Sequence, residues 1–200
     1  MTITYVLELL GCVSFAISGA FAGIQKRLDV FGVLTIAFVT SIGGGTVRDI
    51  LIGELPVSWM IDKYYSAVIF FSTIAAILFW KKLKSFKLPL FIFDTIGLGL
   101  FTIVGVQKAL TAGLKPEICV ALGTITGCFG GITRDILLNN IPLIFRKEIY
   151  ATACIAGGLV YITFRQMGID INITRLCAVS TICFIRIVAV KYKLTLPRMY

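Results

Sequence analysis

The sequence predicts an all-α integral membrane protein with seven transmembrane helices, arranged as an inverted 3+3 repeat plus one C-terminal helix. Hydrophobic residues make up 58% of the chain and charged residues only 14%, which lies outside the range of soluble globular domains. Apolar segments of about 20 residues, the length that crosses a bilayer, recur along the chain. A glycine–arginine–aspartate motif also occurs twice, 86 residues apart.

The apolar segments define the expected helices in chain order: 4–24, 30–52, 63–80, 89–108, 117–138, 148–165 and 173–192. Short connections that contain charged residues and prolines, among them Pro56 and Pro142, separate these segments. No basic stretch precedes the first segment, so we expect a retained helix rather than a cleaved signal peptide. We therefore expect one transmembrane domain over 1–200, with repeat 1 at about 4–84, repeat 2 at about 89–165 and the extra helix at about 173–192.

The loops differ in their basic charge. Eleven lysines and arginines fall on one side of the membrane, including Lys26, Arg27 and Arg146, and five fall on the other, including Lys115. By the positive-inside rule the first side is cytoplasmic, which places the N-terminus outside and the C-terminus inside. Because the basic residues form short clusters between apolar segments, the formal net charge of +9 indicates membrane orientation and no nucleic-acid partner.

The two halves of the chain form an internal repeat. With an offset of 86 residues, positions 8–57 have 13 identities to the second half. The aligned pairs include Glu8 with Asp94, Gly11 with Gly97, Phe15 with Phe101, Thr40 with Thr126 and Pro56 with Pro142. Each repeat contains three spans, an odd number, so the second copy must be inverted relative to the first. In transporters and channels built in this way, the site lies near the middle of the membrane between the repeats.

Consecutive glycines lie inside two of the expected helices, at Gly43, Gly44 and Gly45 and at Gly130 and Gly131. Each glycine weakens a helix by about 1 kcal/mol relative to alanine, so we expect the second and fifth helices to be kinked and broken there. Broken backbone at membrane depth is tolerated where it lines a water-filled cavity, and its free carbonyls can replace part of a cation's hydration shell. Phe129 stands where the first motif has Gly43, so the two copies cannot present identical carbonyls.

Several charged residues also fall within the expected spans, where each costs about 2.5 to 3.5 kcal/mol unless it is paired or hydrated. From their depths we expect two bridges, Glu8 with Arg48 and Asp94 with Arg134. Adjacent residues diverge by about 100° on a helix, so Arg48 is not expected to pair with Asp49. Two interpretations stay open: the bridges hold the helix bundle together, or they orient the glycine carbonyls toward a pore.

Two further groups of charged residues are candidates for a role in ion movement. Asp49 and Asp135 follow the motif arginines and are possible cation-attracting groups. Lys108 closes the fourth span near its outer end, where it either extends to the membrane interface or moves with voltage as part of a gate.

Some classes of function are excluded by composition. The chain has no histidine, and its six cysteines show no C-x-x-C spacing. Haem, histidine-based zinc sites and histidine-dependent serine or cysteine catalysis are therefore excluded. We expect no enzyme activity, no cofactor and no metal beyond transiently bound K⁺ or Na⁺.

The twin motifs GGGTVRDIL (43–51) and GGITRDIL (130–137), together with the seven spans, resemble the prokaryotic members of the trimeric intracellular cation (TRIC) channel family. The resemblance implies a homotrimer in a prokaryotic cell membrane, in which each subunit has its own pore for monovalent cations, mainly potassium. It implies that the kinked second and fifth helices form this pore, at Gly43, Gly44, Gly45, Gly130 and Gly131, with Thr46 and Thr133 as nearby polar groups. The prokaryotic branch is also similar to proteins described as glycine transporters.

Two functions therefore remain from different classes. The first is a passive potassium channel, favoured by glycine-rich helices and few buried carboxylates. The second is a secondary transporter of a small solute such as glycine, because inverted repeats with broken helices are equally typical of transporters.

Overall fold

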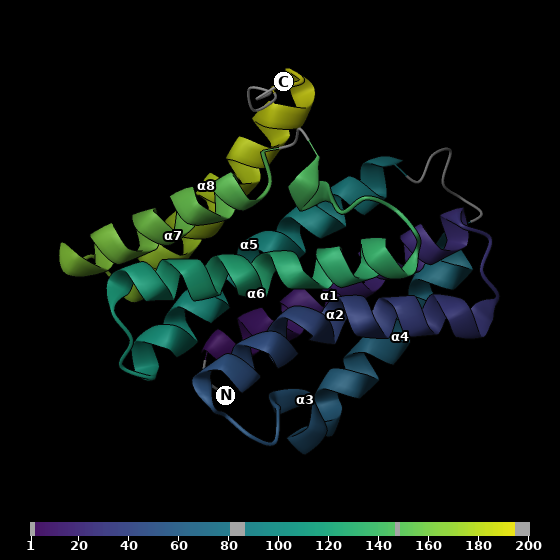
Figure 1. The fold of residues 1–200 in the computed structure, drawn as a ribbon, viewed down its shortest axis with the longest axis horizontal. Coiled ribbons are helices and arrows are strands. Elements are labelled where there is room, and N and C mark those ends of the chain that lie inside the picture. Colours follow the sequence, from purple (N-terminus) through teal and green to yellow (C-terminus); the bar gives the residue numbers. More distant parts are fainter. Residues whose placement is uncertain (1–2, 81–86, 147–148, 195–200) are drawn as a thin grey trace.

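A computed structural model describes residues 3–80, 87–146 and 149–194, and within these ranges the elements are helices joined by short loops (Figure 1). They are α1 (Ile3–Gln25), α2 (Val30–Ile52), α3 (Ser58–Ile61), α4 (Lys63–Phe79), α5 (Lys87–Thr111), α6 (Pro116–Leu137), the 3-10 helix η2 (Leu143–Phe145), α7 (Ala151–Gln166) and α8 (Ile171–Lys191). Some basic residues used to orient the chain, Lys81, Lys82, Lys84, Lys147 and Arg198, lie outside the described residues.

Each of the seven segments expected from the sequence overlaps one helix of at least 16 residues. In the described part of the chain, five helices are long and apolar enough to cross a membrane, namely α1, α2, α5, α6 and α8, and α4 is a shorter apolar helix. The expected bounds differ most at 89–108, which is part of a helix that continues to Thr111, and at 148–165, where α7 begins at Ala151. The short α3 and η2 were not expected, and they follow the equivalent residues Pro56 and Pro142.

Local sequence explains several helix ends. The Asp29 carboxylate accepts a hydrogen bond from the backbone N–H of Gly32 at 2.7 Å and caps α2, and Asp170 caps α8 in the same way. Gly53 ends α2 in the left-handed conformation, with φ of 79°, which a residue without Cβ adopts at little cost. Pro116 is the first residue of α6, where its missing N–H leaves no helical bond unmade.

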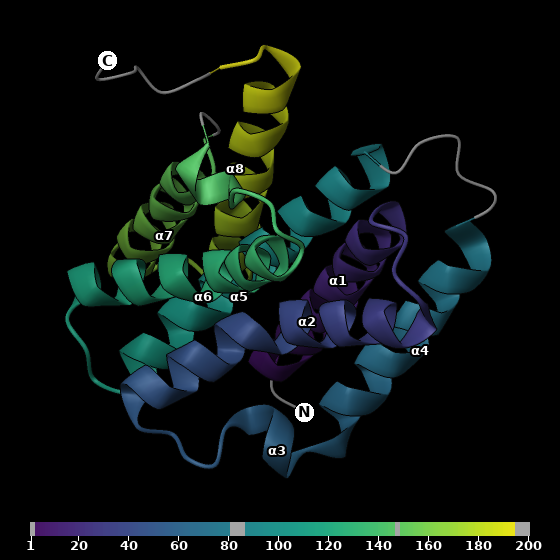
Figure 2. The ribbon, with the colours of Figure 1, turned by 45° about the vertical axis from the view of Figure 1, so that its right-hand side comes forward.

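Four helices form the centre of the molecule. Helix α1 packs against α2 and α5, and α6 packs against α5 and α2. Helix α4 lies against α1 on one side of this group, whereas α7 and α8 lie against α6 and α5 on the other (Figures 1 and 2). Each repeat thus supplies two central helices and one peripheral helix, and α8 is added beside the second repeat.

The glycine segments are not broken, which corrects the expectation from sequence. Both α2 and α6 are α-helical through Gly43–Gly45 and Gly130–Gly131. A Cβ added at Gly44 would lie 2.0 Å from the carbonyl oxygen of Thr126, and one added at Gly130 would lie 2.3 Å from that of Thr40. The missing side chains therefore let two helix backbones touch, and the packing at this crossing offsets the low helix propensity of glycine.

Candidate functional site

The first motif places a buried ion-pair group near the end of α2. The Nη2 of Arg48 lies 2.6 Å from Oε1 of Glu8 on α1 and 2.7 Å from Oδ1 of Asp49. The Nε of Arg48 also donates to the same Asp49 oxygen at 2.8 Å. All three residues are at most 4% exposed. The pair of Glu8 with Arg48 is the one expected from helix depth.

The contact between Arg48 and Asp49 was not expected. Adjacent positions do diverge on a helix, but the arginine side chain is long enough to fold back beside its own backbone, so that two of its nitrogens reach the neighbouring carboxylate. The geometric argument from Cβ directions holds for short side chains and fails for this one.

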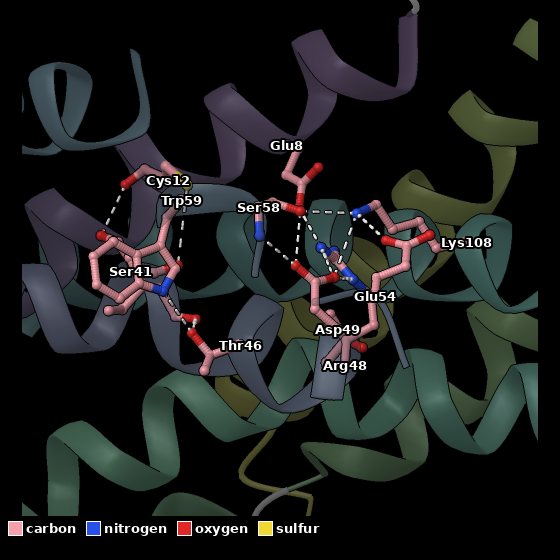
Figure 3. Close-up of polar contacts among 12 residues, drawn as sticks. Glu8, Cys12, Ser41, Thr46, Arg48, Asp49, Glu54, Ser58, Trp59 and Lys108 are labelled. Carbon is pink, nitrogen blue, oxygen red and sulfur yellow. Dashed lines mark hydrogen bonds and ion pairs between the residues drawn. The ribbon is translucent and has the colours of Figure 1, made fainter. Parts of the chain in front are cut away.

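The connection after α2 closes over Asp49. Oδ2 of Asp49 accepts hydrogen bonds from the backbone N–H of Ser58 at 2.9 Å and from its hydroxyl at 2.7 Å, and Ser58 is the first residue of α3. Lys108 reaches from α5 to the same group, with Nζ 3.3 Å from Asp49, 3.0 Å from Glu54 and 3.0 Å from the hydroxyl of Ser58 (Figure 3). The ammonium of Lys108 therefore covers the first motif.

The second motif repeats this construction at the end of α6. The Nη1 of Arg134 lies 2.6 Å from Oδ1 of Asp94 on α5, and its Nε lies 2.9 Å from Oδ1 of Asp135. The other oxygen of Asp135 accepts from the backbone N–H of Leu143, the first residue of η2, at 3.1 Å. Nη1 of Arg134 also donates a hydrogen bond to the hydroxyl oxygen of Ser18 on α1 at 2.8 Å.

The two motif groups differ in the space around them. A cavity of about 160 Å³ opens beside Asp135 and Arg134, and its other polar lining residues are Gln25, Lys26, Asn140 and Arg146. The cavity beside Asp49 and Arg48 has only about 10 Å³. Ala22, which also lines the larger cavity, is the repeat equivalent of Lys108. A small residue thus leaves open on one side the space that a lysine fills on the other.

The two motif groups are separated by close packing. The α2–α6 crossing at Gly44 and Gly130 lies between them, and the rings of Phe15 and Phe101 stack there with centroids 5.3 Å apart and planes 9° from parallel. Both rings are at most 2% exposed. The centre of the molecule is therefore closed in this structure.

The remaining candidate residues from the sequence lie beside the ion pairs, at the α2–α6 crossing, or in hydrogen bonds within their own helices. A Cβ at Gly45 would lie 3.9 Å from the Glu8 carboxylate, and one at Gly131 would lie 3.6 Å from that of Asp94, so these two glycines leave room for the ion pairs. Gly43 lies at the crossing, where a Cβ would be 3.5 Å from the hydroxyl of Thr133. The hydroxyls of Thr46 and Thr133 donate to carbonyls of their own helices, and Thr46 also accepts from Trp59 at 3.1 Å.

Sequence reasoning missed several contributors to the motif groups: Ser18, Glu54 and Ser58. Ser58 had a recognisable signal, since serine is common at helix starts, and here it is the first residue of α3, next to the N-cap Val57. Ser18 and Glu54 had none, because their roles depend on which helices meet.

The amino-acid sequence of this chain is similar to those of known membrane proteins. The family model described as "Glycine transporter" matches residues 5–81 and again 91–166, and these segments begin 86 residues apart. The UPF0126 inner membrane protein YadS of Escherichia coli K12 is 38% identical over 199 residues, which cover 98% of this chain and 95% of the relative.

Solved structures are similar over nearly the whole chain. One is the TRIC trimeric intracellular cation channel orthologue from Rhodobacter sphaeroides, with a TM-score of 0.92 and 30% identity, covering 97% of this chain and 100% of the other. A second is a prokaryotic TRIC channel in 0.5 M KCl, with a TM-score of 0.89 and 34% identity, covering 97% and 98%.

Proposed function

We propose that this chain, which belongs to the family described as "Glycine transporter" and is similar in structure to TRIC cation channels, is itself a channel for monovalent cations, mainly potassium. The pore lies within each subunit, between the first and second motif groups. No catalytic step is part of this proposal, because the structural neighbours are channels.

The observation that carries the proposal is the twofold arrangement around the α2–α6 crossing. Each side of the crossing has one carboxylate from α1 or α5, one motif arginine and one motif aspartate. Buried charges of this kind are costly in a membrane and usually mark an ion path. The crossing itself is made of glycines, whose missing side chains leave carbonyl oxygens as the nearest polar atoms.

The structure supports a closed pore with a defined obstruction. Lys108 covers Asp49 on one side, and the crossing with the Phe15–Phe101 stack closes the middle. Conduction therefore requires Lys108 to leave Asp49 and requires α2 and α6 to bend apart at their glycines. Gly43, Thr46 and Thr133 would then line the opened segment with Gly44, Gly45, Gly130 and Gly131, and Asp49 and Asp135 would attract the cation at its two ends.

The location of the protein in the cell is supported by its relatives and by its apolar helices. The protein is a multi-pass membrane protein of the bacterial inner membrane type, as its relative YadS is. We further propose that all seven long helices cross the bilayer as inverted repeats, with the N-terminus outside and the C-terminus in the cytoplasm. The solved relative from Rhodobacter sphaeroides is trimeric, and a homotrimer is proposed here as well.

Planar-bilayer recording tests the channel. Purified protein in symmetric KCl is expected to give discrete unitary currents, and a K⁺/Na⁺ gradient gives their selectivity from the reversal potential. The same recording on Lys108→Ala ties the currents to this protein, because a contaminant would not respond to the substitution. A purified, folded protein that gives no unitary current would rule the channel out.

The second candidate is a secondary transporter of glycine, favoured by the description of the matching family. In proteoliposomes it predicts saturable uptake of radiolabelled glycine that unlabelled glycine inhibits and that depends on an ion gradient. Uptake of this kind without unitary currents would replace the channel by the transporter.

A further inference from the structure

Helices α1 and α8 both pack against α5, and a crevice of about 210 Å³ lies between them. Leu100 of α5 lines it and is 8% exposed, whereas Leu176 of α8 lines it and is 69% exposed, so the crevice leads from the surface of the molecule toward α5. Its other apolar lining residues are Ile3, Leu7 and Val179. All three helices are long and apolar enough to cross a membrane, so the crevice lies within the apolar layer of the molecule.

A chain of hydrogen bonds between neutral groups holds Arg175 of α8 at one end of this crevice. Its Nη2 donates to the hydroxyl of Thr4 on α1 at 3.1 Å, and that hydroxyl donates to Oε1 of Gln107 on α5 at 3.0 Å. The amide nitrogen of Gln107 donates to the hydroxyl of Tyr161 on α7 at 3.0 Å. Nη1 of Arg175 donates to Oδ1 of Asn172 at 3.2 Å. These contacts orient the guanidinium without neutralising it, and they place the starts of α1 and α8 and the end of α5 on one side of the molecule.

The two ends of the crevice differ in polarity. Its polar lining residues, Asn172 and Arg175, lie within about 6 Å of the start of α8, at about 1.5 Å per residue. Val179 lies about 12 Å along the same helix, and Leu100 lies about 16 Å from the end of α5 at Thr111. The crevice is therefore polar near the helix ends and apolar toward their middle, which is the order of groups in a phospholipid.

The charge of Arg175 has no counter-ion in the part of the chain that the structure describes. The buried arginines Arg48, Arg134 and Arg186 each lie within ion-pair distance of a carboxylate, but no described carboxylate lies this close to Arg175. Asp170 caps α8 with hydrogen bonds from two backbone N–H groups instead. The Nε of Arg175 is also buried without a hydrogen-bond partner among the described residues. A cation at a membrane interface is stabilised by an anionic group, and a phosphate accepts hydrogen bonds from a guanidinium.

We propose that this crevice is a binding site for one phospholipid, whose phosphate pairs with the guanidinium of Arg175 and whose acyl chain lies along Val179 and Leu100. The phosphate supplies the negative charge that the described residues around Arg175 do not, and the apolar walls bury part of the chain. In the proposed orientation of the protein, this is a lipid of the outer leaflet. The site depends on the packing of α1, α5 and α8, and it does not require that the protein conducts ions.

Native mass spectrometry of the protein in mild detergent tests the site. Phosphatidylglycerol and diacylglycerol with the same acyl chains are added separately, because only the first has a phosphate. The wild type is expected to bind one phosphatidylglycerol per subunit at a several-fold lower concentration than diacylglycerol. Arg175→Gln is expected to need a several-fold higher concentration of phosphatidylglycerol than the wild type and the same concentration of diacylglycerol.

Three further variants separate charge, shape and folding. Arg175→Lys keeps the charge and is expected to keep the preference for phosphatidylglycerol. Leu7→Trp fills the apolar part of the crevice and is expected to weaken the binding of both lipids several-fold. Arg165→Gln removes an exposed arginine at the end of α7, on the same side of the molecule as the start of α8, and is expected to bind both lipids as the wild type does.

Each other outcome would overturn the site. Equal affinity of the wild type and Arg175→Gln for phosphatidylglycerol would show that Arg175 does not bind the phosphate. A second copy of this chain in the crevice would appear in the same spectra as a loss of oligomer in Leu7→Trp and Arg175→Gln with unchanged lipid binding per subunit. Should Arg175→Gln fail to fold, the wild type with the two lipids and Leu7→Trp decide the matter, and equal binding of the two lipids by the wild type would count against the site. These measurements do not depend on K⁺ current, so failure of the channel and failure of this site are distinguished.

Discussion

At the scale of single residues, each motif arginine serves two carboxylates at once. Arg48 joins Glu8 of α1 to Asp49 of α2, and Arg134 joins Asp94 of α5 to Asp135 of α6. The guanidinium has several N–H donors in a fixed plane, so one side chain can pair with two oxygens at short distance. The same contact neutralises the charges and ties neighbouring helices together.

Removal of one such arginine should destabilise the fold. Arg48→Ala leaves Glu8 and Asp49 buried without their guanidinium, and loss of one partner of a buried pair costs about 3 to 5 kcal/mol. We expect a marked fall in the unfolding temperature in detergent. Arg165→Ala, at the exposed end of α7, is the control and should leave it unchanged. An Arg48→Ala protein with wild-type stability and K⁺ flux would contradict both roles of the bridge.

Lys108 and its repeat equivalent Ala22 allow two opposite substitutions, one that removes a cation from the first motif group and one that adds a cation beside the second. Lys108→Ala removes the ammonium that covers Asp49 and opens the small cavity on that side, so we expect a several-fold higher open probability in bilayers. Ala22→Lys places a cation in the larger cavity and should lower the conductance. An open probability of Lys108→Ala that equals the wild-type value would show that Lys108 does not obstruct the pore.

At the scale of elements, the α2–α6 crossing determines what the glycines do. Neighbouring glycines face different surroundings: Gly44 meets the backbone of α6, Gly45 meets the first ion pair, and Gly43 has only ordinary contacts. Three glycines in a row indicated an unwound segment, because each lowers helix propensity. Packing reversed that outcome, since close backbone contact between two helices needs a glycine at the point of contact.

The crossing predicts opposite effects for adjacent alanine substitutions. Gly44→Ala places a Cβ 2.0 Å from the Thr126 carbonyl oxygen, so the helices must separate, at a cost of about 1 to 3 kcal/mol. Gly43→Ala places its Cβ no nearer than 3.5 Å to its neighbours and gains up to about 1 kcal/mol of helix propensity. Unfolding temperatures in detergent should therefore fall for the first and hold or rise for the second. Equal temperatures for the two variants would show that this crossing is not tightly packed.

At the scale of the whole molecule, basic charge in the loops is the basis for the orientation that we propose for the helix bundle. Basic residues of one set of connections, such as Lys26 after α1 and Arg146 after η2, lie on the side of the larger cavity. From the positive-inside rule we propose that this side faces the cytoplasm. The open carboxylate Asp135 would then face the inside of the cell, and Lys108 would face the outside.

Cysteine labelling tests this orientation. A membrane-impermeant maleimide applied to intact cells is expected to label Lys115→Cys, in the loop before α6, and not Lys26→Cys, in the loop after α1. The six native cysteines are buried or partly buried, so the unmodified chain supplies the background. After the cells are opened, both variants should react. Labelling of Lys26→Cys alone in intact cells would invert the proposed topology.

Sequence alone determined where the five helices of membrane-spanning length lie, together with both carboxylate–arginine pairs between neighbouring helices. Apolar length and the cost of an unpaired charge in a membrane are properties of the residues themselves, and they hold in any packing. The tertiary structure alone decided that the glycines stay helical, that Lys108 covers Asp49, and that a cavity opens beside Asp135. These outcomes depend on how helices distant in sequence are rotated and crossed. A long basic side chain pairs with a carboxylate, and a glycine backbone contacts another helix, only where the packing brings the two groups together.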